Sequence, residues 1–455
     1  MIGPRFASGC RPVTGHSTGR LARSVFWCAS LVLFSAAHIS AADPVAPSDE
    51  NVPTPIADSA FTTTVRQVTV GPKHHFFGYF GHVQTIPWNQ SGRFLIALRT
   101  DFQDRMPRPG EAAEIVQIDT RKNDATRTVD VTRGWNFQQG AMLYWNPEAA
   151  ETQFFFNDRD PETQEVFCVL FDVTTLTRIR EYRVPGMSIG NGGVAQNGGA
   201  FLGINYGRMA RLRPVTGYPG AHDQTADRPG HPDDDGIFRI DAKTGEKRLL
   251  VSYRQMADAI RPLRPDVDEK ELFINHTLWS RDDSRIYFFA RGDFDVDGKK
   301  RLDIPFTMNA DGTNLKPLAR HIGGHPEWFS GDVLIGHVDG RQVLFDVETQ
   351  AVVGMIGTPE SIPSPGGDIA LSADRKWFLN AYGRKDQNFY NVVRLADGAW
   401  TRTAGFSRGG YTSGVLRIDP SPNWNRDATQ FLFVAVDDAG TRQIHVATIE
   451  KRPTK

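Results

Sequence analysis

The chain has 455 residues, of which 40% are hydrophobic and 23% charged, a composition typical of a soluble globular protein with an ample core. Its 52 basic and 53 acidic residues give a net charge of -1 at pH 7. This balance argues against a nucleic-acid partner or an anionic membrane surface, so an anionic ligand would have to be held by a local group of arginines.

Residues 1–42 have the pattern of a secretory signal peptide. Arginines precede an apolar run from Val25 to Ala37, which ends in small residues near Ala42. Because this run is short for a membrane span, we expect cleavage near residue 42, with an uncleaved signal anchor as the alternative. We therefore expect a periplasmic or extracellular protein with no membrane span after cleavage. Residues 43–59, rich in Pro, Ala, Ser and Asp, are expected to form a flexible linker.

From residue 60 to about 450, strand-like runs alternate with turns rich in Gly, Asp and Asn, and they divide into seven units of about 55 residues. Most units carry a strand followed by an acidic turn, as in Leu170-Phe-Asp172 and Leu344-Phe-Asp346. A short helix is expected only near 252–260. A segment at about 207–236, rich in Pro, Gly, Asp and Arg, is expected to be a long loop inserted over one face.

Four segments in the second half of the chain share one register. A polar residue stands three positions before a large apolar one, and these leading residues recur at spacings of 49, 43 and 53: His276, His325, Asp368 and Ser421. Such repetition predicts an all-β fold, a seven-bladed β-propeller of four-stranded antiparallel blades. A two-sheet sandwich or a pair of barrels would not produce a fixed register. In a propeller the leading residues would lie at one height around the axis.

Cys168 is the only cysteine that would remain after cleavage, so an intramolecular disulfide is excluded in the mature chain. It lies within the apolar run Val166-Phe-Cys-Val-Leu-Phe171. A buried, unreactive thiol is therefore expected.

Several blocks resemble a bacterial propeller group related to the oligogalacturonate lyases and, more loosely, to the ulvan lyases. The resemblance covers nearly all of the chain after the leader, and its most specific parts are Gly71-Pro-Lys-His-His-Phe-Phe-Gly-Tyr-Phe80 and Trp135-Asn-Phe-Gln-Gln-Gly140. Further parts are Asn157-Asp-Arg159, Tyr206-Gly-Arg208, Gly324-His-Pro-Glu-Trp328 and Arg417-Ile-Asp-Pro-Ser-Pro-Asn-Trp424.

The resemblance implies a central cleft that binds an acidic oligosaccharide or polysaccharide containing uronate and cleaves it by β-elimination, with a divalent metal such as manganese. We expect a monomer. The sequence departs from the family where histidines are expected in the sixth and seventh blades, since it has Asp368 and Ser421 there. A non-catalytic propeller that binds glycan or protein in the cell envelope is therefore the alternative function.

Elimination next to a uronate carboxylate needs a base, a group that neutralises the carboxylate, and an acid for the leaving oxygen. Histidine suits proton transfer, and arginine or a metal suits neutralisation. His276 and His325, with Asp368, are the candidate ligands of Mn or Zn, and His276 is also a catalytic candidate. The alternative for the two histidines is to cap inner strands around a water-filled channel.

The remaining candidates come from several other parts of the chain. For catalysis we select His75, Tyr206 and Arg208. For substrate binding we select His74, Tyr79, Gln138, Gln139, Arg211, Tyr218 and Asn275. The arginines are expected to clamp a carboxylate, because a guanidinium binds it bidentately. Alternatively, the insertion is a solvated basic loop, and His74 and His75 close the ring by packing the first blade against the last.

A calcium site is not favoured. Asp293-Phe-Asp-Val-Asp-Gly298 has the spacing of the first half of a calcium loop, but the twelfth position is Ile304 instead of Glu. An Asp-rich turn between strands is the simpler reading.

Overall fold

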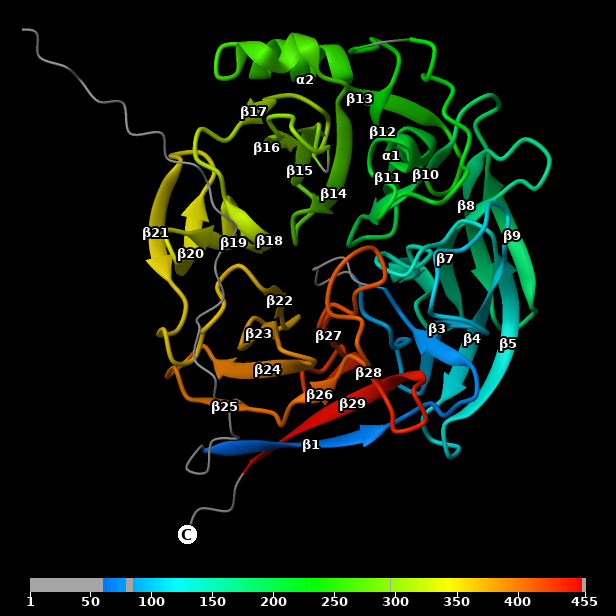
Figure 1. Ribbon diagram of the computed structural model, residues 1–455, viewed down its shortest axis with the longest axis vertical. Helices are drawn as coiled ribbons and strands as arrows, with labels where there is room; N and C mark the ends of the chain where they lie inside the picture. The colour runs from blue at the N-terminus through cyan, green and yellow to red at the C-terminus, as the bar shows by residue number, and fades with distance from the viewer. Residues whose placement is uncertain (1–59, 79–84, 229, 295, 452–455) are drawn as a thin grey trace, which may run out of the picture. The chain divides into compact units, whose positions relative to one another are not determined.

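The computed structural model describes residues 60–78, 85–228, 230–294 and 296–451. The predicted signal peptide and linker lie outside these residues. Seven antiparallel sheets are arranged in a ring (Figure 1), which confirms the predicted seven-bladed β-propeller. No helix in the described part of the chain is long and apolar enough to cross a membrane.

Each blade is a sheet of sequential antiparallel strands that runs from the axis outward. From the innermost strand, blade 1 contains β2 (His74–Phe76), β3 (Phe94–Thr100), β4 (Ala113–Asp119) and β5 (Ala125–Thr132); blade 2 contains β6 (Tyr144–Trp145), β7 (Gln153–Arg159), β8 (Val166–Asp172) and β9 (Thr177–Tyr182); blade 3 contains β10 (Ile189–Val194), β11 (Ala200–Asn205), β12 (Gly236–Asp241) and β13 (Lys247–Ser252); blade 4 contains β14 (Phe273–Trp279), β15 (Arg285–Gly292), β16 (Leu302–Asn309) and β17 (Lys316–Pro317).

The remaining blades follow the same order. Blade 5 contains β18 (Gly323–Ser330), β19 (Val333–Val338), β20 (Arg341–Asp346) and β21 (Ala351–Met355); blade 6 contains β22 (Asp368–Leu371), β23 (Trp377–Arg384), β24 (Gln387–Arg394) and β25 (Trp400–Arg402), with β26 (Phe406–Ser407) also paired to β24; blade 7 contains β27 (Asn423–Trp424), β28 (Gln430–Val436), β29 (Arg442–Lys451) and, outermost, β1 (Phe61–Gln67).

Blade 7 combines strands from both ends of the described chain. Strand β1 pairs antiparallel with β29, from Phe61 opposite Lys451 to Gln67 opposite His445. A segment before blade 1 thus completes the last sheet and closes the ring (Figure 1). Because β1 precedes blade 1 in the chain, its pairing in blade 7 holds the two ends of the ring together.

The indole N–H groups of inner-strand tryptophans explain the repeated register. Each donates to a main-chain oxygen of the preceding blade, on its inner strand or, for Pro87, between its first two strands, at 2.8 to 3.2 Å: Trp145 to Pro87, Trp279 to Gly193, Trp328 to Leu278, and Trp424 to Ala370. In three of these pairs the acceptor directly precedes that blade's own large apolar residue, Trp88, Trp279 or Leu371. The tryptophans therefore fix the height of one blade against the next.

The acidic turns predicted from the sequence link the third and fourth strands of six blades. In each, the carboxylate accepts a hydrogen bond from a main-chain N–H two residues on, an arrangement that stabilises tight turns. These residues are Asp119, Asp172, Asp241, Asp311, Asp346 and Asp397.

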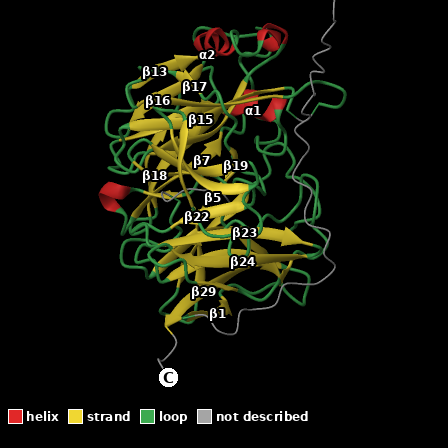
Figure 2. Cartoon of the chain, turned by 90° about the vertical axis from the view of Figure 1, so that its left-hand side faces the viewer, coloured by secondary structure: helices red, strands yellow, loops and turns green. Residues whose placement is uncertain are grey.

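Helices are few beside the strands (Figure 2). Helix α2 (Tyr253–Ile260) confirms the predicted short helix, and a capping box between Ser252 and Gln255 begins it. Helix α1 (Tyr206–Leu212) begins the insertion, so this first part is helical and not the loop we expected. Single 3-10 turns occur at η1 (Pro147–Ala149) and η2 (Pro265–Glu269).

Candidate functional site

The leading residues of the repeat gather at the end of the axis where the inner strands begin, which we call the upper face. The backbone there is unusual: His276, Ser421 and Met142, the residue three positions before Trp145, have φ values of 54°, 46° and 54°. Residues other than glycine seldom adopt this left-handed backbone conformation, and such conformations concentrate at functional sites. In blade 4 the strand pairing shifts register between Asn275 and Leu278, so a bulge surrounds His276.

The structure brings His276, His325, Asp368 and Ser421 into one chain of contacts across four blades. The imidazole centroids of His276 and His325 are 5.6 Å apart. Nδ1 of His325 lies 2.9 Å from Oδ1 of Asp368, and Oδ2 of Asp368 accepts a hydrogen bond of 2.9 Å from the main-chain N–H of Ser421. The prediction that these leading residues become neighbours is therefore confirmed.

The charge around His325 favours its protonated form. Burial lowers the pKa of this imidazole, but the charge of Asp368, the hydrogen bond to Asp368 and the charge of Asp419 together raise it above its usual value. The side chain remains 31% exposed, so a ligand can reach it.

Arg417 and Asp419 were not selected as site residues from the sequence, although both lie in the last block of the resemblance. Nε of Arg417 donates to Oδ1 of Asp419 at 3.0 Å. Burial, and then the charge of Asp368, raise the pKa of the Asp419 carboxyl, while Arg417 and His325 oppose this rise. The motif alone could not identify them, because their position next to the axis depends on the path of the segment between blades 6 and 7.

The predicted metal ligands form a hydrogen-bonded unit. Both carboxylate oxygens of Asp368 face protein donors, and the described residues contain no group of three or more His, Cys, Asp or Glu side chains arranged to hold a metal. In this conformation a three-ligand site for Mn or Zn is not formed by His276, His325 and Asp368. The metal therefore stays a prediction, and we derive the chemistry of the site from its side chains alone.

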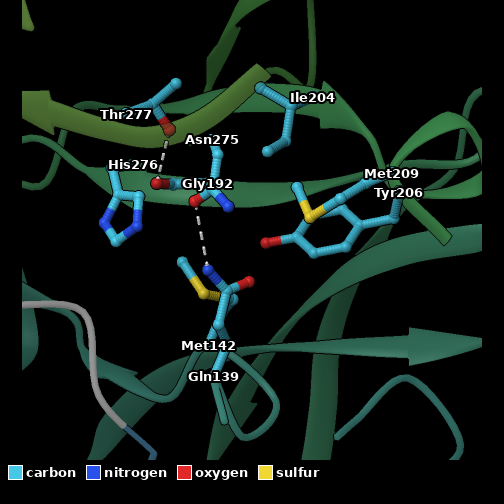
Figure 3. Close-up of a pocket in the computed structure, with 9 residues that line it drawn as sticks. All are labelled: Gln139, Met142, Gly192, Ile204, Tyr206, Met209, Asn275, His276 and Thr277. Atoms are coloured by element: carbon cyan, nitrogen blue, oxygen red, sulfur yellow. Dashed lines mark hydrogen bonds between the residues drawn. The ribbon is translucent and has the colours of Figure 1, made fainter. Parts of the chain in front are cut away.

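A small cavity beside His276 is lined by other candidates from the sequence (Figure 3). Gln139, Asn275, His276 and Tyr206 all border it, and Nε2 of Gln139 points to Oδ1 of Asn275 at 3.5 Å. Oε1 of Gln139 is buried and has no hydrogen-bond partner among the described residues. Because a buried carbonyl normally accepts a hydrogen bond, this oxygen is suited to a water or to a ligand hydroxyl.

Tyr206 and Tyr218 form a buried aromatic pair. Their rings are stacked with centroids 4.5 Å apart, and their hydroxyls contact Asn191 and Asn157. Burial raises the pKa of both hydroxyls, so neither is suited to lose a proton near neutral pH. Tyr206 contributes its ring to the cavity wall, and Tyr218 supports that ring.

Arg208 does not have the geometry of the carboxylate clamp that we predicted. It is fully buried, and its guanidinium donates to Leu272 O, Thr225 Oγ1 and Gly230 O while it packs over the ring of Tyr253. These contacts occupy all three nitrogens within the fold. Arg208 therefore anchors the insertion, and we remove it from the proposed site.

Arg211 is likewise paired within the protein. Its guanidinium forms ion pairs with Asp223 and Glu271 at 2.8 and 2.6 Å. The insertion is thus a folded segment held by specific contacts, and not the solvated basic loop that was the alternative. Arg211 has no free fork for a substrate carboxylate while these pairs are intact.

His74 and His75 lie at the contact between the first and last blades. Nδ1 of His74 accepts from the main-chain N–H of Arg442 at 3.1 Å, and Nδ1 of His75 lies 3.0 Å from Oε1 of Gln443. Burial, only partly opposed by the hydrogen bond to Gln443, lowers the pKa of His75 to about 4. These contacts match the alternative role in ring closure.

Three remaining expectations concern single residues. Gln138 is half-buried, and its Nε2 donates to Arg417 O at 2.9 Å, which ties the segment before blade 2 to the segment before blade 7. Tyr79 lies outside the described residues. Cys168 is buried, and burial raises the pKa of its thiol, which fits an unreactive cysteine.

The suggested first ligand of a calcium loop is already paired. Oδ2 of Asp293 accepts from Nζ of Lys270 at 2.9 Å. An ammonium group therefore occupies the place that a calcium ion would need at this carboxylate, in line with a structural turn.

Comparison with protein-family models found no match, and comparison with curated proteins found no significant match. Among solved structures, TolB from Acinetobacter baumannii is 12% identical, with a TM-score of 0.35 over 70% of this chain and 64% of that chain. The alignment thus spans less than two thirds of that TolB.

Two further propeller structures are similarly distant. The β-propeller domain of Cps50 (Swd1) from Myceliophteria thermophila is 9% identical, with a TM-score of 0.43 over 88% of this chain and 99% of that chain. The β-propeller domain of the Trilobed protease from Pyrococcus furiosus is 9% identical, with a TM-score of 0.43 over 82% and 94%. The class of this protein, a seven-bladed β-propeller, is defined by its own strand order and closure.

Proposed function

We propose that this propeller binds a uronate-containing oligosaccharide at the upper end of its axis and cleaves it by β-elimination. The observation that carries the proposal is the pairing of two imidazoles from neighbouring blades, His276 and His325, beside a carboxylate that orients one of them. The sequence resemblance to oligogalacturonate lyases supports the choice of reaction. The leader pattern in residues 1–42 supports a periplasmic or extracellular location.

The two histidines supply the proton transfers. Because the charge of Asp368 favours the protonated form of His325, this imidazole is suited to give a proton from Nε2, and His276 is suited to be the base. One imidazole takes the proton from C5 of the uronate, the bond between C4 and O4 breaks, and the second imidazole, protonated, gives a proton to the departing O4. A double bond forms between C4 and C5, and no water is consumed.

Arg417 replaces Arg208 as the proposed partner of the substrate carboxylate. Its side chain is 34% exposed and lies beside Asp419, whose charge acts on His325. A guanidinium here opposes the negative charge that builds up on the uronate as its C5 proton leaves. Gln139 and Asn275 lie beside His276 and are suited to bind sugar hydroxyls.

The test is an assay of purified protein with a panel of uronate oligosaccharides, followed by the ultraviolet absorbance of the unsaturated product. Turnover that is lost in His325→Ala would support the proposal. If no oligosaccharide of the panel gives an unsaturated product, the proposed lyase activity is contradicted.

A non-catalytic glycan- or protein-binding propeller is the second candidate. It is favoured by Asp368 and Ser421, which stand where the resemblance predicts histidines and which hydrogen-bond to each other instead. Under this function the native protein would bind acidic oligosaccharides without changing them. Glycan binding without turnover would therefore select it.

A further inference from the structure

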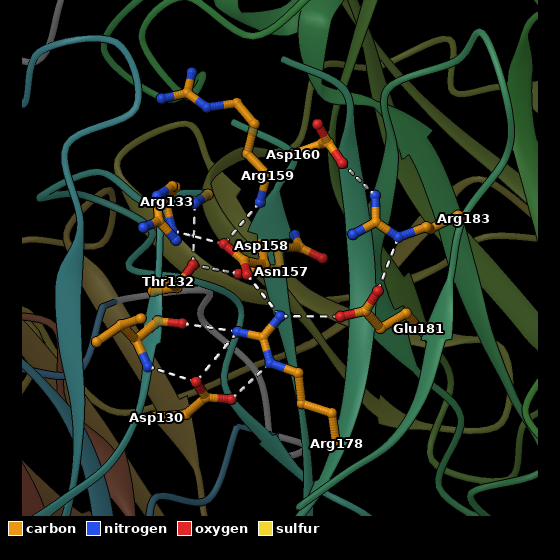
Figure 4. A network of polar contacts seen from close by, with 12 residues as sticks. Asp130, Thr132, Arg133, Asn157, Asp158, Arg159, Asp160, Arg178, Glu181 and Arg183 are labelled. Carbon is orange, nitrogen blue, oxygen red and sulfur yellow. Dashed lines mark hydrogen bonds and ion pairs between the residues drawn. The ribbon is translucent and has the colours of Figure 1, made fainter. Parts of the chain in front are cut away.

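Two arginines outside the proposed site lie side by side on the upper face, between blades 1 and 2 (Figure 4). Arg133 directly follows β5, and Arg159 is the last residue of β7. The main-chain N–H groups of both donate to the same oxygen, Oδ1 of Asp158, at 2.7 and 2.8 Å. Their side chains therefore begin from neighbouring points.

The acidic side chains of this network are directed to other arginines. Oδ2 of Asp158 pairs with Arg178 at 2.9 Å, and the same guanidinium also binds Asp130 and Glu181. By contrast, neither Arg133 nor Arg159 forms an ion pair with any carboxylate in the described ranges. The guanidinium of Arg178 thus contacts three carboxylates, whereas those of Arg133 and Arg159 contact none among the described residues.

Arg159 is the more unusual of the two because it is only 2% exposed. Its Nη1 donates to Pro219 O at 2.5 Å, and its buried Nε has no partner among the described residues. Burial lowers its pKa to about 10; the charge of Asp158 opposes this fall, and the charge of Arg133 adds to it. A buried cation is normally paired with an anion, since leaving it unpaired is costly.

We propose that Arg133 and Arg159 together bind an oxyanion, the carboxylate or sulfate group of an acidic glycan. Arg159 supplies a guanidinium held in place by Pro219 of the insertion, and Arg133 supplies a second, partly exposed one that begins beside the same aspartate. Guanidinium groups bind such anions through paired, charge-assisted hydrogen bonds. The bound anion would also relieve the repulsion between the two arginines.

This arginine pair is linked to the axial cavity through packed side chains. The choice of a glycan as its ligand rests on the proposed function. Asn157, two residues before Arg159 on β7, donates to the hydroxyl of Tyr218, which stacks on Tyr206 in the cavity wall. The arginine pair and the cavity thus lie on the two sides of one packed layer.

The alternative is that Arg133 and Arg159 only balance the charge of the acids around Arg178. Calorimetric titration of His325→Ala protein, in which turnover is removed, separates the two. The probes are a uronate oligosaccharide, a sulfated oligosaccharide without uronate, and a neutral one of equal length. We expect Arg133→Gln and Arg159→Gln each to weaken binding of an acidic probe at least tenfold, and the probe that responds identifies the oxyanion. The neutral probe should be unaffected.

Arg121→Gln is the matched control, since Arg121 is an exposed arginine that forms no carboxylate pair in the described part of the chain. If both test variants bind the acidic probes as tightly as this control, the proposal is overturned. If Arg159→Gln does not fold, Arg133→Gln decides alone, because the side chain of Arg133 makes no hydrogen bond within the described residues.

The test also separates this site from the proposed lyase activity. If the native protein shows no turnover but binds acidic probes in an arginine-dependent way, the oxyanion site is supported and the lyase activity is contradicted. If no acidic oligosaccharide binds, inorganic sulfate at constant ionic strength decides: a saturable rise in Tm that Arg133→Gln abolishes supports the site. No effect of sulfate would refute it.

Discussion

Nδ1 of His325 lies 2.9 Å from Oδ1 of Asp368, a contact that joins the inner strands of blades 5 and 6 at the axis. The second oxygen of the same carboxylate accepts from the main chain of Ser421 at the beginning of blade 7. One buried side chain thus links three successive blades and fixes the orientation of an imidazole. This relationship makes His325 the best-positioned proton-transfer group among the described residues.

Asp368→Asn should reduce turnover at least tenfold while the fold is retained. An amide can still accept from Ser421, but it lacks the charge that raises the pKa of His325 and it does not hold one tautomer of the imidazole as firmly. The measurement is the initial rate across a pH series, which should show the loss of an apparent pKa above the ordinary histidine value. An unchanged profile would mean that Asp368 does not act through His325.

His276→Ala should abolish turnover without unfolding the protein. The side chain contacts His325 and borders the cavity, and it is not part of the main apolar clusters. Activity and Tm are measured together, with His222→Ala as the control because His222 is exposed in the insertion. Full activity in the His276 variant would remove this histidine from the mechanism.

Chelation of metal ions with EDTA should leave turnover unchanged. The reason is the chemistry of the donor set: Asp368 is held by an ion pair with His325 and a hydrogen bond from Ser421, and the two histidines alone make a weak site. The check is the rate before and after EDTA treatment, followed by addition of Mn²⁺ or Zn²⁺. Loss of the rate with EDTA and its recovery with Mn²⁺ would show that Asp368 turns from His325 to a metal.

The buried carboxyl of Asp235 should make the protein less stable as the pH rises from about 4 to about 6. Burial raises its pKa to about 6, above that of an ordinary aspartate, against the hydrogen bonds from Asn205 and Gly236. The folded state therefore holds the proton more tightly than the unfolded state, and this contribution is present at low pH and lost as the pH passes the folded pKa. Its size is about 3 kcal/mol.

Urea unfolding of the native protein and Asp235→Asn between pH 4 and pH 7 checks this expectation. The variant carries a constant offset from its altered hydrogen bonds, but it should lack this component of the pH dependence. Parallel stability curves for the two proteins would contradict the raised pKa.

Trp328→Phe should lower the free energy of unfolding by about 1 to 3 kcal/mol, because it removes the bond from the indole to Leu278 and leaves a gap between blades 4 and 5. Trp400→Phe is the matched control, since Trp400 lies partly exposed on the short outer strand β25. Chemical denaturation measures both. Equal losses would mean that the inter-blade bond adds nothing beyond the size of the side chain.

The repeat was readable from the sequence because its cause recurs in successive blades. A large apolar residue packs each inner strand and four tryptophans bond to the blade before, so the same pattern recurs wherever such a blade begins. The acidic turns were readable because their cause is local, since each carboxylate bonds to a main-chain group only two residues away. The two patterns together predicted the seven blades.

The roles of the arginines could not be read in the same way. The sequence predicted Arg208 as a carboxylate clamp and did not single out Arg417, but the first is buried within the fold and the second lies beside Asp419. Which arginine meets solvent is decided by the packing of loops from different blades. The same holds for Arg133 and Arg159, which Asp158 brings together.

The sequence by itself therefore determined the class of fold, the equivalence of the leading positions and the set of chemical groups available near the axis. Only the tertiary structure decided which of these groups touch, because His325 meets Asp368 through the packing of two neighbouring blades, and His75 meets Gln443 through the closure of the ring. Local spacing sets how each blade is built, while closure sets which side chains share one small volume.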